Sequence, residues 1–182
     1  MIDAGLAIAL VFAAVARSLS GTVVSIEPSR PAKLMVQAEG QFQTFAVARR
    51  AVIERETKFK DDSAATKARI GLSDLTPGEY VKLDIGAKGR VTHALAVVLL
   101  ERAKVRSVNG SSVVLEDGTT LTIGSVLRFV TEEGKPSATA TVRPGESVLL
   151  FRHPETRNIY RFSPEPHSRP HGSARAHKRA NA

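Results

Sequence analysis

Two stretches of the sequence share one pattern, LTPGEYVKL at residues 75–83 and VRPGESVLL at residues 142–150. In each stretch a Pro-Gly pair is followed by Glu and then by apolar residues at alternating positions. Proline fixes its own φ and glycine accepts a positive φ, so each pair favours a type II turn that leads the chain into a strand. The sequence therefore predicts one turn-and-strand unit that occurs twice in an all-β protein.

Two more correspondences precede this pattern, in the same order along the chain. Residues 22–26, TVVSI, match residues 104–108, KVRSV, and residues 34–40, LMVQAEG, match residues 113–118, VVLEDG. Correspondences that keep one order indicate a diverged duplication, because a chance likeness has no reason to keep its place along the chain. We therefore expect two copies of one small fold in tandem.

Hairpin turns divide both copies into short strands. Asn109-Gly110 and Asp117-Gly118 lie between apolar runs and are typical of type I′ turns, which join antiparallel strands. In the first copy we expect strands near residues 21–26, 33–38, 42–48, 80–85 and 90–98. In the second copy we expect them near residues 104–108, 112–116, 119–123, 147–151 and 158–162, with one more extended piece near residues 126–130. Residues 51–75 are expected to hold a short helical turn.

In each copy, three hairpin strands, a longer crossing segment and two final strands match the elements of an OB-like barrel. A small SH3-like or ribosomal-type barrel has similar signals and stays an alternative. The predicted organisation is all-β. An apolar N-terminal helix or signal segment occupies residues 1–20, two tandem five-stranded OB-like barrels occupy residues 21–100 and 101–163, and a disordered basic tail occupies residues 164–182. The apolar junction at residues 97–100 predicts that the two barrels touch.

A resemblance to a known kind of domain rests on two of these segments. Residues 21–26, GTVVSI, and residues 72–83, LSDLTPGEYVKL, resemble the small OB-like β-barrel domain of exported bacterial proteins of unknown function. The similarity extends well over residues 21–98 and less well over residues 103–162. It implies a periplasmic or cell-surface module in two diverged tandem copies. Its motifs are structural turns, so the resemblance implies no catalytic residues.

The N-terminus has the features of a signal peptide without the usual basic start. Residues 6–15, LAIALVFAAV, form an uninterrupted apolar run, and AVA at residues 14–16 resembles a cleavage site. The run is shorter than the roughly 20 residues that cross a bilayer, so no permanent transmembrane span is expected. Asp3 stands where Lys or Arg is usual, and a buried helix or an uncleaved anchor stays an alternative. Cleavage predicts a periplasmic or secreted chain that begins at Arg17 or Gly21.

The chain is basic, with 26 Lys and Arg residues against 18 Asp and Glu residues and a net charge of +8. Such a balance predicts an acidic partner: an unknown protein, an anionic glycan, a lipid surface or, as the alternative, nucleic acid. Residues 164–182 have no large apolar side chain and are expected to be disordered. The candidate contacts to an anionic partner are basic residues of this tail, namely Arg169, Arg175, Lys178 and Arg179.

No catalytic, cofactor or metal site is predicted. The absence of Cys excludes thiolate chemistry and Cys-based zinc sites. The chain has no Walker A loop, dinucleotide fingerprint, nucleophile elbow or HExxH motif. The tail histidines at positions 167, 171 and 177 lack the spacing and the carboxylate partner of a metal site. His93 and His153 lie at matching places near the last hairpin of each copy. Three roles stay open for them: paired ligands, pH-sensitive contacts, or ordinary residues of a strand and a turn.

These observations favour a non-enzymatic binding or structural module that is exported to the periplasm or the cell surface. The alternative is a single-stranded nucleic-acid-binding OB-fold protein, because small barrels bind single strands through a basic groove and aromatic platforms. The aromatic side chains lie at apolar strand positions and are expected mostly in the core, which weakens this alternative. They are Phe42, Phe45, Tyr80, Phe151, Tyr160 and Phe162.

Overall fold

The computed structural model describes residues 16–62 and 64–166. These residues form twelve β-strands and one short 3-10 helix, η1 (Leu72–Asp74), so the all-β prediction is confirmed for them. Among the residues described, no helix has the length and apolar character needed to cross a bilayer. Residues 1–15 of the predicted N-terminal helix or signal segment lie outside the described residues, as does the tail from residue 167 onward. Residues 17–20, which were assigned to the same segment, belong instead to the first strand.

Most of the strands are short, but two of them, β3 (Gln41–Phe59) and β6 (Val91–Asn109), have 19 residues each. The others are β1 (Arg17–Glu27), β2 (Lys33–Ala38), β4 (Ala65–Arg69), β5 (Tyr80–Ile85), β7 (Ser112–Leu115), β8 (Thr120–Thr122), β9 (Arg128–Val130), β10 (Pro136–Ser137), β11 (Ser147–Arg152) and β12 (Ile159–Pro164).

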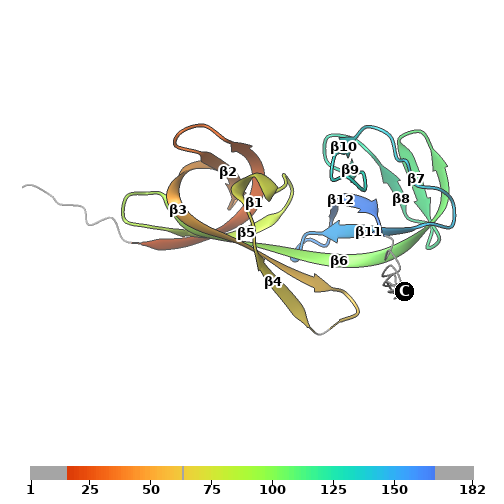
Figure 1. Cartoon of the computed structure of the whole chain (residues 1–182), viewed down its shortest axis with the longest axis horizontal. Helices are drawn as coiled ribbons and strands as arrows, with labels where there is room; N and C mark the ends of the chain where they lie inside the picture. The colour runs from red at the N-terminus through yellow and green to blue at the C-terminus, as the bar shows by residue number, and fades with distance from the viewer. Residues whose placement is uncertain (1–15, 63, 167–182) are drawn as a thin grey trace, which may run out of the picture.

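The first lobe consists of β1 to β5 and the first part of β6, residues 91–100. Its strand pairings return to their starting point. β1 pairs with β2, β2 with β3, β3 with β6, β6 with β5 and β5 with β1. All of these pairings are antiparallel except β3–β6, which is parallel. β4 extends the edge of β3 and forms with it a hairpin that projects from the lobe (Figure 1).

The second lobe consists of the remainder of β6 and strands β7 to β12. β6 pairs with both β7 and β11, β7 pairs with β8, and β11 pairs with β12. β12 then pairs in parallel with β9, and β9 pairs with the short β10. In both lobes, therefore, the last strand lies parallel to a strand that comes earlier in the same lobe.

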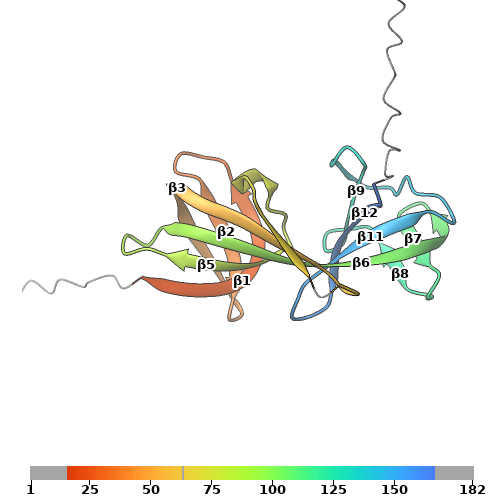
Figure 2. The same cartoon turned by 60° about the horizontal axis from the view of Figure 1, so that its bottom comes forward.

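β6 is one continuous strand where two separate strands were predicted. Its residues 91–100 pair within the first lobe, and residues 99–109 pair with strands of the second. Figures 1 and 2 show β6 running from one lobe into the other. The sequence from Val91 to Asn109 has no Gly or Pro, so nothing in it ends the strand between the lobes.

The region between residues 51 and 75 contains the predicted short helical turn as η1, but most of it consists of strands that were not predicted. β3 continues through it to Phe59, β4 returns beside β3, and η1 is a single turn after β4. Beyond residue 51 only Ile53 of β3 is buried, and every residue of β4 is exposed. Many residues of this hairpin are charged and are exposed or half-buried, so it lacks the apolar alternation by which strands are recognised.

The Pro-Gly turns form as predicted in both lobes. Gly78 has a φ of +96° and Gly145 a φ of +86°, and in each turn the following Glu amide donates to the residue before proline, over 3.0 and 3.1 Å. The Gly78 amide also donates to the Val23 carbonyl over 2.8 Å, and the Gly145 amide donates to the Val105 carbonyl over 2.7 Å. Each turn is thereby joined to the first strand of its own lobe.

Each lobe has its own apolar core. The first core consists of Val23, Leu34, Val36, Phe45, Val47, Ile53, Leu75, Val81, Leu83, Ile85, Val91, Ala94 and Ala96. The second consists of Val105, Val113, Leu115, Leu121, Phe129, Val142, Val148, Leu150 and Phe162. Burial of these side chains is the main stabilising contribution within each lobe.

The two lobes are in direct contact, as the apolar junction predicted. His153 Nε2 lies 3.1 Å from the Thr22 hydroxyl, and the His153 ring meets the Tyr80 ring edge-on at a centroid distance of 5.0 Å. Arg161 donates from Nη1 to the Thr76 hydroxyl over 3.1 Å. The loop after β11 and strand β12 therefore pack against β1, β5 and the first Pro-Gly turn.

Candidate functional site

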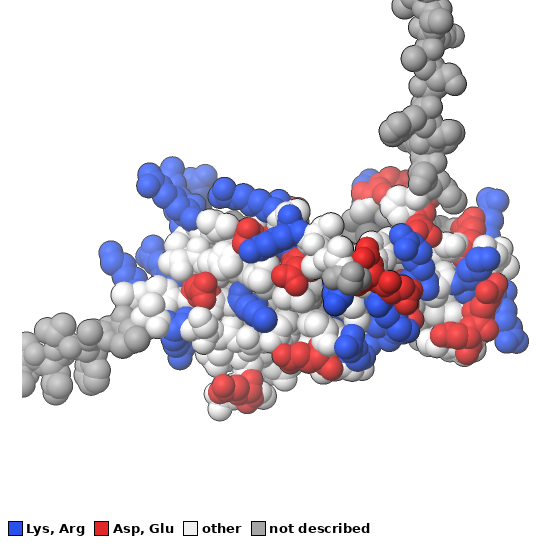
Figure 3. All heavy atoms as spheres, turned by 90° about the horizontal axis from the view of Figure 1, so that it is seen from below, with Lys and Arg blue, Asp and Glu red and all other residues white. Residues whose placement is uncertain are grey.

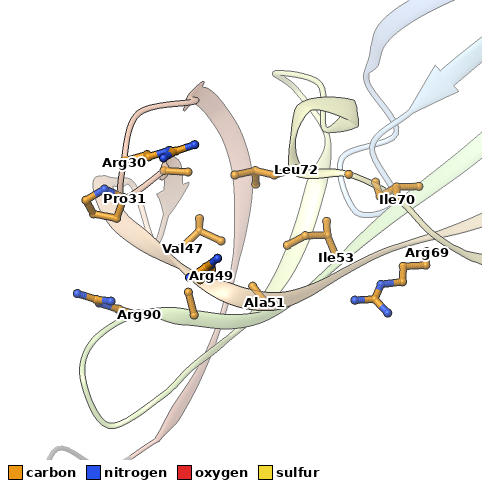
Figure 4. A pocket seen from close by; sticks show the side chains of 13 residues that line it. Arg30, Pro31, Val47, Arg49, Ala51, Ile53, Arg69, Ile70, Leu72 and Arg90 are labelled. Carbon is orange, nitrogen blue, oxygen red and sulfur yellow. The ribbon is translucent and has the colours of Figure 1, made fainter.

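A groove of about 660 Å³ opens in the first lobe between the β1–β2 loop and the segment that follows β4. Figure 4 shows Arg30 and Pro31 on one side, Ile70 and Leu72 on the other, and β3 below them. The uncharged residues that line it are Pro31, Ala32, Val47, Ala48, Ala51, Ile53, Ile70, Gly71 and Leu72. An apolar lining of this kind favours a ligand that has uncharged groups of its own.

Four arginines also line this groove, which we call the four-arginine groove. Arg30 comes from the β1–β2 loop, Arg49 from β3, Arg69 from the end of β4, and Arg90 from the residue before β6. All four are exposed, and the described residues that line the groove include no Asp or Glu. Within the described chain no ion pair, side-chain hydrogen bond or ring contact engages their guanidinium groups. The groove therefore presents positive charge that the protein does not neutralise.

An irregularity in β3 makes room for the groove. In the parallel β3–β6 pairing, Val47 lies opposite Val91 and Val52 lies opposite His93, so the register shifts between these points. Residues 48–51 are absent from every registered pair that β3 makes with β2, β4 or β6. Bulges of this kind are frequent next to functional sites because they change the direction of side chains and end the pairing locally.

The second lobe has a smaller groove in a comparable place, beside the β8–β9 break and β10. It measures about 370 Å³ and is lined by Ile123, Gly124, Arg128, Phe129, Pro136, Ser137 and Ala138. Arg128 is the one charged residue among them. Figure 3 shows Lys and Arg gathered along one margin of the first lobe, whereas basic and acidic side chains intermingle over the second. Uncompensated positive charge is thus concentrated in the first lobe.

A second cluster of charged residues lies buried where the lobes meet. Glu79 has no exposed surface and accepts hydrogen bonds from Arg55 Nη2, at 2.9 and 3.2 Å to its two oxygens, and from the Thr76 amide at 3.1 Å. Burial raises the pKa of the Glu79 carboxyl, and the positive charge of Arg55 opposes this rise. Both donors belong to the first lobe, so the hydrogen bonds of Glu79 join β3 to the first Pro-Gly turn within that lobe.

The second lobe supplies the other side of this buried cluster. The Arg161 guanidinium stacks on the Phe151 ring at 3.6 Å, and burial lowers the pKa of Arg161. Tyr160 is buried beside it, and burial together with the charge of Glu79 raises the pKa of the Tyr160 hydroxyl. The electrostatic influence of Glu79 therefore reaches both Arg161 and Tyr160 across the contact between the lobes.

His93 joins three neighbouring strands on the surface of the first lobe. Its Nε2 lies 2.9 Å from a Glu54 oxygen and its Nδ1 lies 3.2 Å from an Asp84 oxygen. Hydrogen bonds from Lys67 and His93 lower the pKa of the Glu54 carboxyl, and hydrogen bonds from Ser18 and His93 lower the pKa of the Asp84 carboxyl. This arrangement ties β3, β6 and β5 together where the parallel pairing closes the lobe.

The lowered pKa values of Glu54 and Asp84 predict a defined acid sensitivity. Because both values lie lower in the folded chain than their ordinary values of 4.5 and 3.8, the stability they contribute is complete above those values and is lost as the pH falls through the folded ones. We expect His93→Ala to lower the free energy of unfolding at neutral pH and to flatten its decline in acid. Urea unfolding across this pH range checks the prediction, with Lys88→Ala as the control. Equal slopes for His93→Ala and the unaltered chain contradict it.

The structure distributes the residues singled out from the sequence over several places. Arg169, Arg175, Lys178 and Arg179 lie outside the described residues. His93 contacts two carboxylates on the surface, and His153 is buried at the contact between the lobes, where burial lowers its pKa. The two histidines therefore have different surroundings and do not form a pair.

Most of the aromatic side chains lie in the interior, as expected. Phe45, Tyr80, Tyr160 and Phe162 are buried, whereas Phe42 is 67% exposed. None of the aromatic residues belongs to the described lining of the four-arginine groove. A stacking platform for bases is therefore absent from the lining of that groove.

No protein-family model matches the chain, and no curated protein is found to be similar to it. The resemblance to the small OB-like domain of exported bacterial proteins stays a prediction from the residues that carry it. The four-arginine groove is accordingly interpreted from its own residues, charges and geometry.

The arginines of the groove were not identified from the sequence. Arg30, Arg49, Arg69 and Arg90 are spread over the first half of the chain and belong to no motif. One signal was present, because Arg49-Arg50 interrupts the apolar alternation of β3 between Val47 and Ala51. In a regular strand, two consecutive arginines direct one charged side chain to each face of the sheet; otherwise they mark a bulge. Both arrangements are unusual for a strand of a small core and indicate a candidate binding site.

Proposed function

We propose that the protein is a non-enzymatic binding module of two diverged, tandem OB-like barrels, and that it binds an anionic, chain-like ligand in the four-arginine groove. The observation that carries the proposal is the set of arginines around an apolar floor, with no carboxylate in the lining and no guanidinium partner within the described chain. Guanidinium groups bind carboxylate, sulfate and phosphate through paired hydrogen bonds.

The order of the strand pairings supports an OB-like barrel for the first lobe. The OB fold is a five-stranded, partly open Greek-key barrel that binds ligands on the face of its second and third strands and on the loops that join strands one to two and four to five. Arg30 lies in the β1–β2 loop, Arg49 lies on the third strand, and Arg90 lies in the loop between β5 and β6. On this proposal, the groove corresponds to the surface at which the OB fold binds oligonucleotides and oligosaccharides.

Equivalent pairings in the second lobe support the duplication. The register shift in β1 lies between Val23 and Ser25, and that in β6 lies between Val105 and Ser107. Thr22 pairs with the first residue of β5, and Lys104 pairs with the first residue of β11. On this basis β8 and β9 together correspond to β3, the third strand of the first copy. The break between β8 and β9 then corresponds to the irregular residues 48–51 of β3.

The lining of the groove supports a protein or glycan ligand over nucleic acid. Acidic peptides, sulfated or uronic-acid glycans and single strands all carry the negative charge that the arginines need. Single strands also gain much of their affinity by stacking on aromatic rings, and the described lining offers none. The binding experiment includes a single-stranded oligonucleotide so that nucleic acid is also tested as a ligand.

Binding measurements with charged and neutral probes test the proposed function. The probes are heparin oligosaccharide, oligothymidylate, poly-glutamate and neutral dextran, measured by fluorescence anisotropy at low and high salt. We expect at least one anionic probe to bind with salt-dependent affinity and dextran not to bind. Arg49→Ala should weaken binding about tenfold, which corresponds to about 1.4 kcal/mol.

A matched variant shows whether the groove itself carries the binding. Arg106 is exposed on β6 in the second lobe and lines none of the grooves described above, so Arg106→Ala removes the same charge from elsewhere. We expect its affinity to stay within about twofold of the unaltered chain, in keeping with a distant exposed charge. Equal losses in Arg49→Ala and Arg106→Ala, or the absence of binding to every anionic probe, contradict the proposed function.

We also propose that the module acts outside the cytoplasm, with a mature chain that begins at Arg17. β1 starts at this residue, and residues 17–20 pair with β5, so cleavage before Arg17 leaves the strand whole, whereas cleavage before Gly21 removes four of its residue pairs. Mass spectrometry of the chain from a periplasmic fraction should give residues 17–182. Recovery of the chain with an intact Met1 in the cytosol contradicts export.

A further inference from the structure

One edge of β3 is covered by two strands that leave a gap between them. β2 pairs with β3 as far as Ala46, and β4 begins to pair at Glu54. At the margins of the gap, the Val47 amide donates to the Ala32 carbonyl over 2.7 Å, and the Ile53 carbonyl accepts from the Ile70 amide over 2.9 Å. Between these bonds the edge of β3 has no registered neighbour.

The backbone at residues 48–51 has no strand beside it on this edge. Val47 and Ile53 both use the edge, through their hydrogen bonds to Ala32 and Ile70. Residues 48–51 belong to no registered pair of β3, so the bulged stretch leaves an uncovered edge between β2 and β4. An uncovered strand edge is a template for pairing with another chain.

We propose that the four-arginine groove binds an acidic peptide segment, which adds to β3 as a short strand between β2 and β4. The proposal rests on the proposed function, since it names the ligand of the same groove. It places peptide backbone opposite residues 48–51, carboxylates at the arginines, and the remaining side chains on the apolar floor.

A peptide meets three demands of the groove together. Its backbone supplies alternating donors and acceptors to the uncovered edge of β3, which is the basis of recognition by strand addition. Its Asp and Glu side chains supply planar carboxylates to Arg30, Arg49, Arg69 and Arg90. Its apolar side chains cover Val47, Ile53, Ile70 and Leu72, which line the floor. Nucleotides and glycans lack this combination of a regular amide ladder and apolar side chains.

The length of the gap sets the length of the ligand. Val47 lies opposite Val91 and Ile53 lies opposite Ala94, so the gap corresponds to three steps along β6, or about 10 Å at roughly 3.3 Å per residue. A peptide segment of about three to four residues therefore covers the gap, and its ends must turn away from the sheet at the β1–β2 loop and at residue 70. Alternating acidic and apolar residues place the two kinds of side chain on opposite faces of such a strand.

Three synthetic peptides test strand addition on the full chain. The first is acetylated and amidated Glu-Val-Glu-Val-Glu-Val-Glu; the second carries N-methyl groups on its valines, and the third carries them on its internal glutamates. All three have the same charge, but each methylated peptide has lost the amide donors of one edge. We expect the first peptide to bind, and one methylated peptide to bind at least about tenfold more weakly while the other keeps its affinity, because only one edge faces β3.

Hydrogen exchange and the other anionic probes separate the possible outcomes. Slower exchange of amides within residues 48–51 with the first peptide bound supports strand addition. Equal affinities for all three peptides overturn it and leave the proposed function intact. Binding of oligothymidylate or heparin through Arg49, without binding of the first peptide, also overturns the peptide proposal alone. Failure of every anionic probe overturns both proposals.

Discussion

Glu79→Ala is expected to lower the free energy of unfolding by about 3–5 kcal/mol, the usual cost of removing one partner of a buried ion pair. The carboxylate has no exposed surface and holds Arg55 and the Thr76 amide, and its charge also reaches Arg161 of the second lobe. Without it, two partly or wholly buried guanidinium groups lose their counter-charge. Urea unfolding at neutral pH measures the loss.

The second Pro-Gly-Glu turn supplies the matched control for Glu79. Glu146 occupies the same position in that turn and accepts a hydrogen bond from the Arg143 amide over 2.9 Å, but it is only half-buried and has no ion-pair partner within the described chain. Glu146→Ala should cost about 1 kcal/mol, the value of an ordinary hydrogen bond. If the two variants lose the same stability, the buried ion pair of Glu79 contributes no more than an ordinary hydrogen bond of a turn.

Gly78→Ala is expected to cost about 2–5 kcal/mol, for two reasons that add. The residue has a φ of +96°, at which a side chain costs about 1–2 kcal/mol. An added Cβ would also lie 2.7 Å from Tyr160 Cβ in the second lobe, which overpacks the contact between the lobes and costs about 1–3 kcal/mol more. Thermal and urea unfolding of the purified variant measure the sum.

Gly145→Ala separates these two contributions. Gly145 has a φ of +86° at the same position of the second turn, but an added Cβ there meets no atom within 4 Å. Its substitution should cost only about 1–2 kcal/mol for the backbone conformation. The difference between the two variants measures the packing of Tyr160 on the first turn. Equal losses would show that Tyr160 moves aside freely and that the lobes are not tightly joined there.

The strands that the sequence predicted best are those with a buried alternation next to a turn signal. β2 and β5 coincide with the predicted residues 33–38 and 80–85, and both place apolar side chains at alternate positions in the core. The Pro-Gly turns were predictable for the same reason, because their backbone conformation restricts which residues are allowed. Local sequence determined structure wherever burial and turn chemistry agreed.

The long strands could not be predicted from local sequence. The part of β3 beyond residue 53 is mostly half-buried and β4 is exposed. They are strands because β3 pairs with β4 on one edge and with β6 on the other. β6 is continuous because its first half pairs with strands of the first lobe and its second half pairs with strands of the second. Two of these partners, β3 and β11, lie far away in the sequence, so a short window of residues does not reveal them. Tertiary pairing decides such segments, whereas propensity contributes little.

The candidate site could be anticipated from the sequence only as a basic character of the chain. The sequence drew attention to the tail arginines and Lys178, because they lie in one short segment, whereas the groove collects Arg30, Arg49, Arg69 and Arg90 from four separate elements. The closure of the first lobe brings these four together, and the irregularity of β3 opens the space between them. Sites of this type depend on register, which a composition or a motif does not reveal.

The most direct test of the four-arginine groove is a map of amide chemical shifts of the labelled chain during titration with an anionic probe. Heparin oligosaccharide and the alternating Glu-Val peptide are both suitable. The proposed function predicts that the largest changes fall on residues 30, 32, 47–49, 51, 53, 69–72 and 90, which line the groove. Changes confined to the second lobe or to the basic tail, with these residues unaffected, would contradict it.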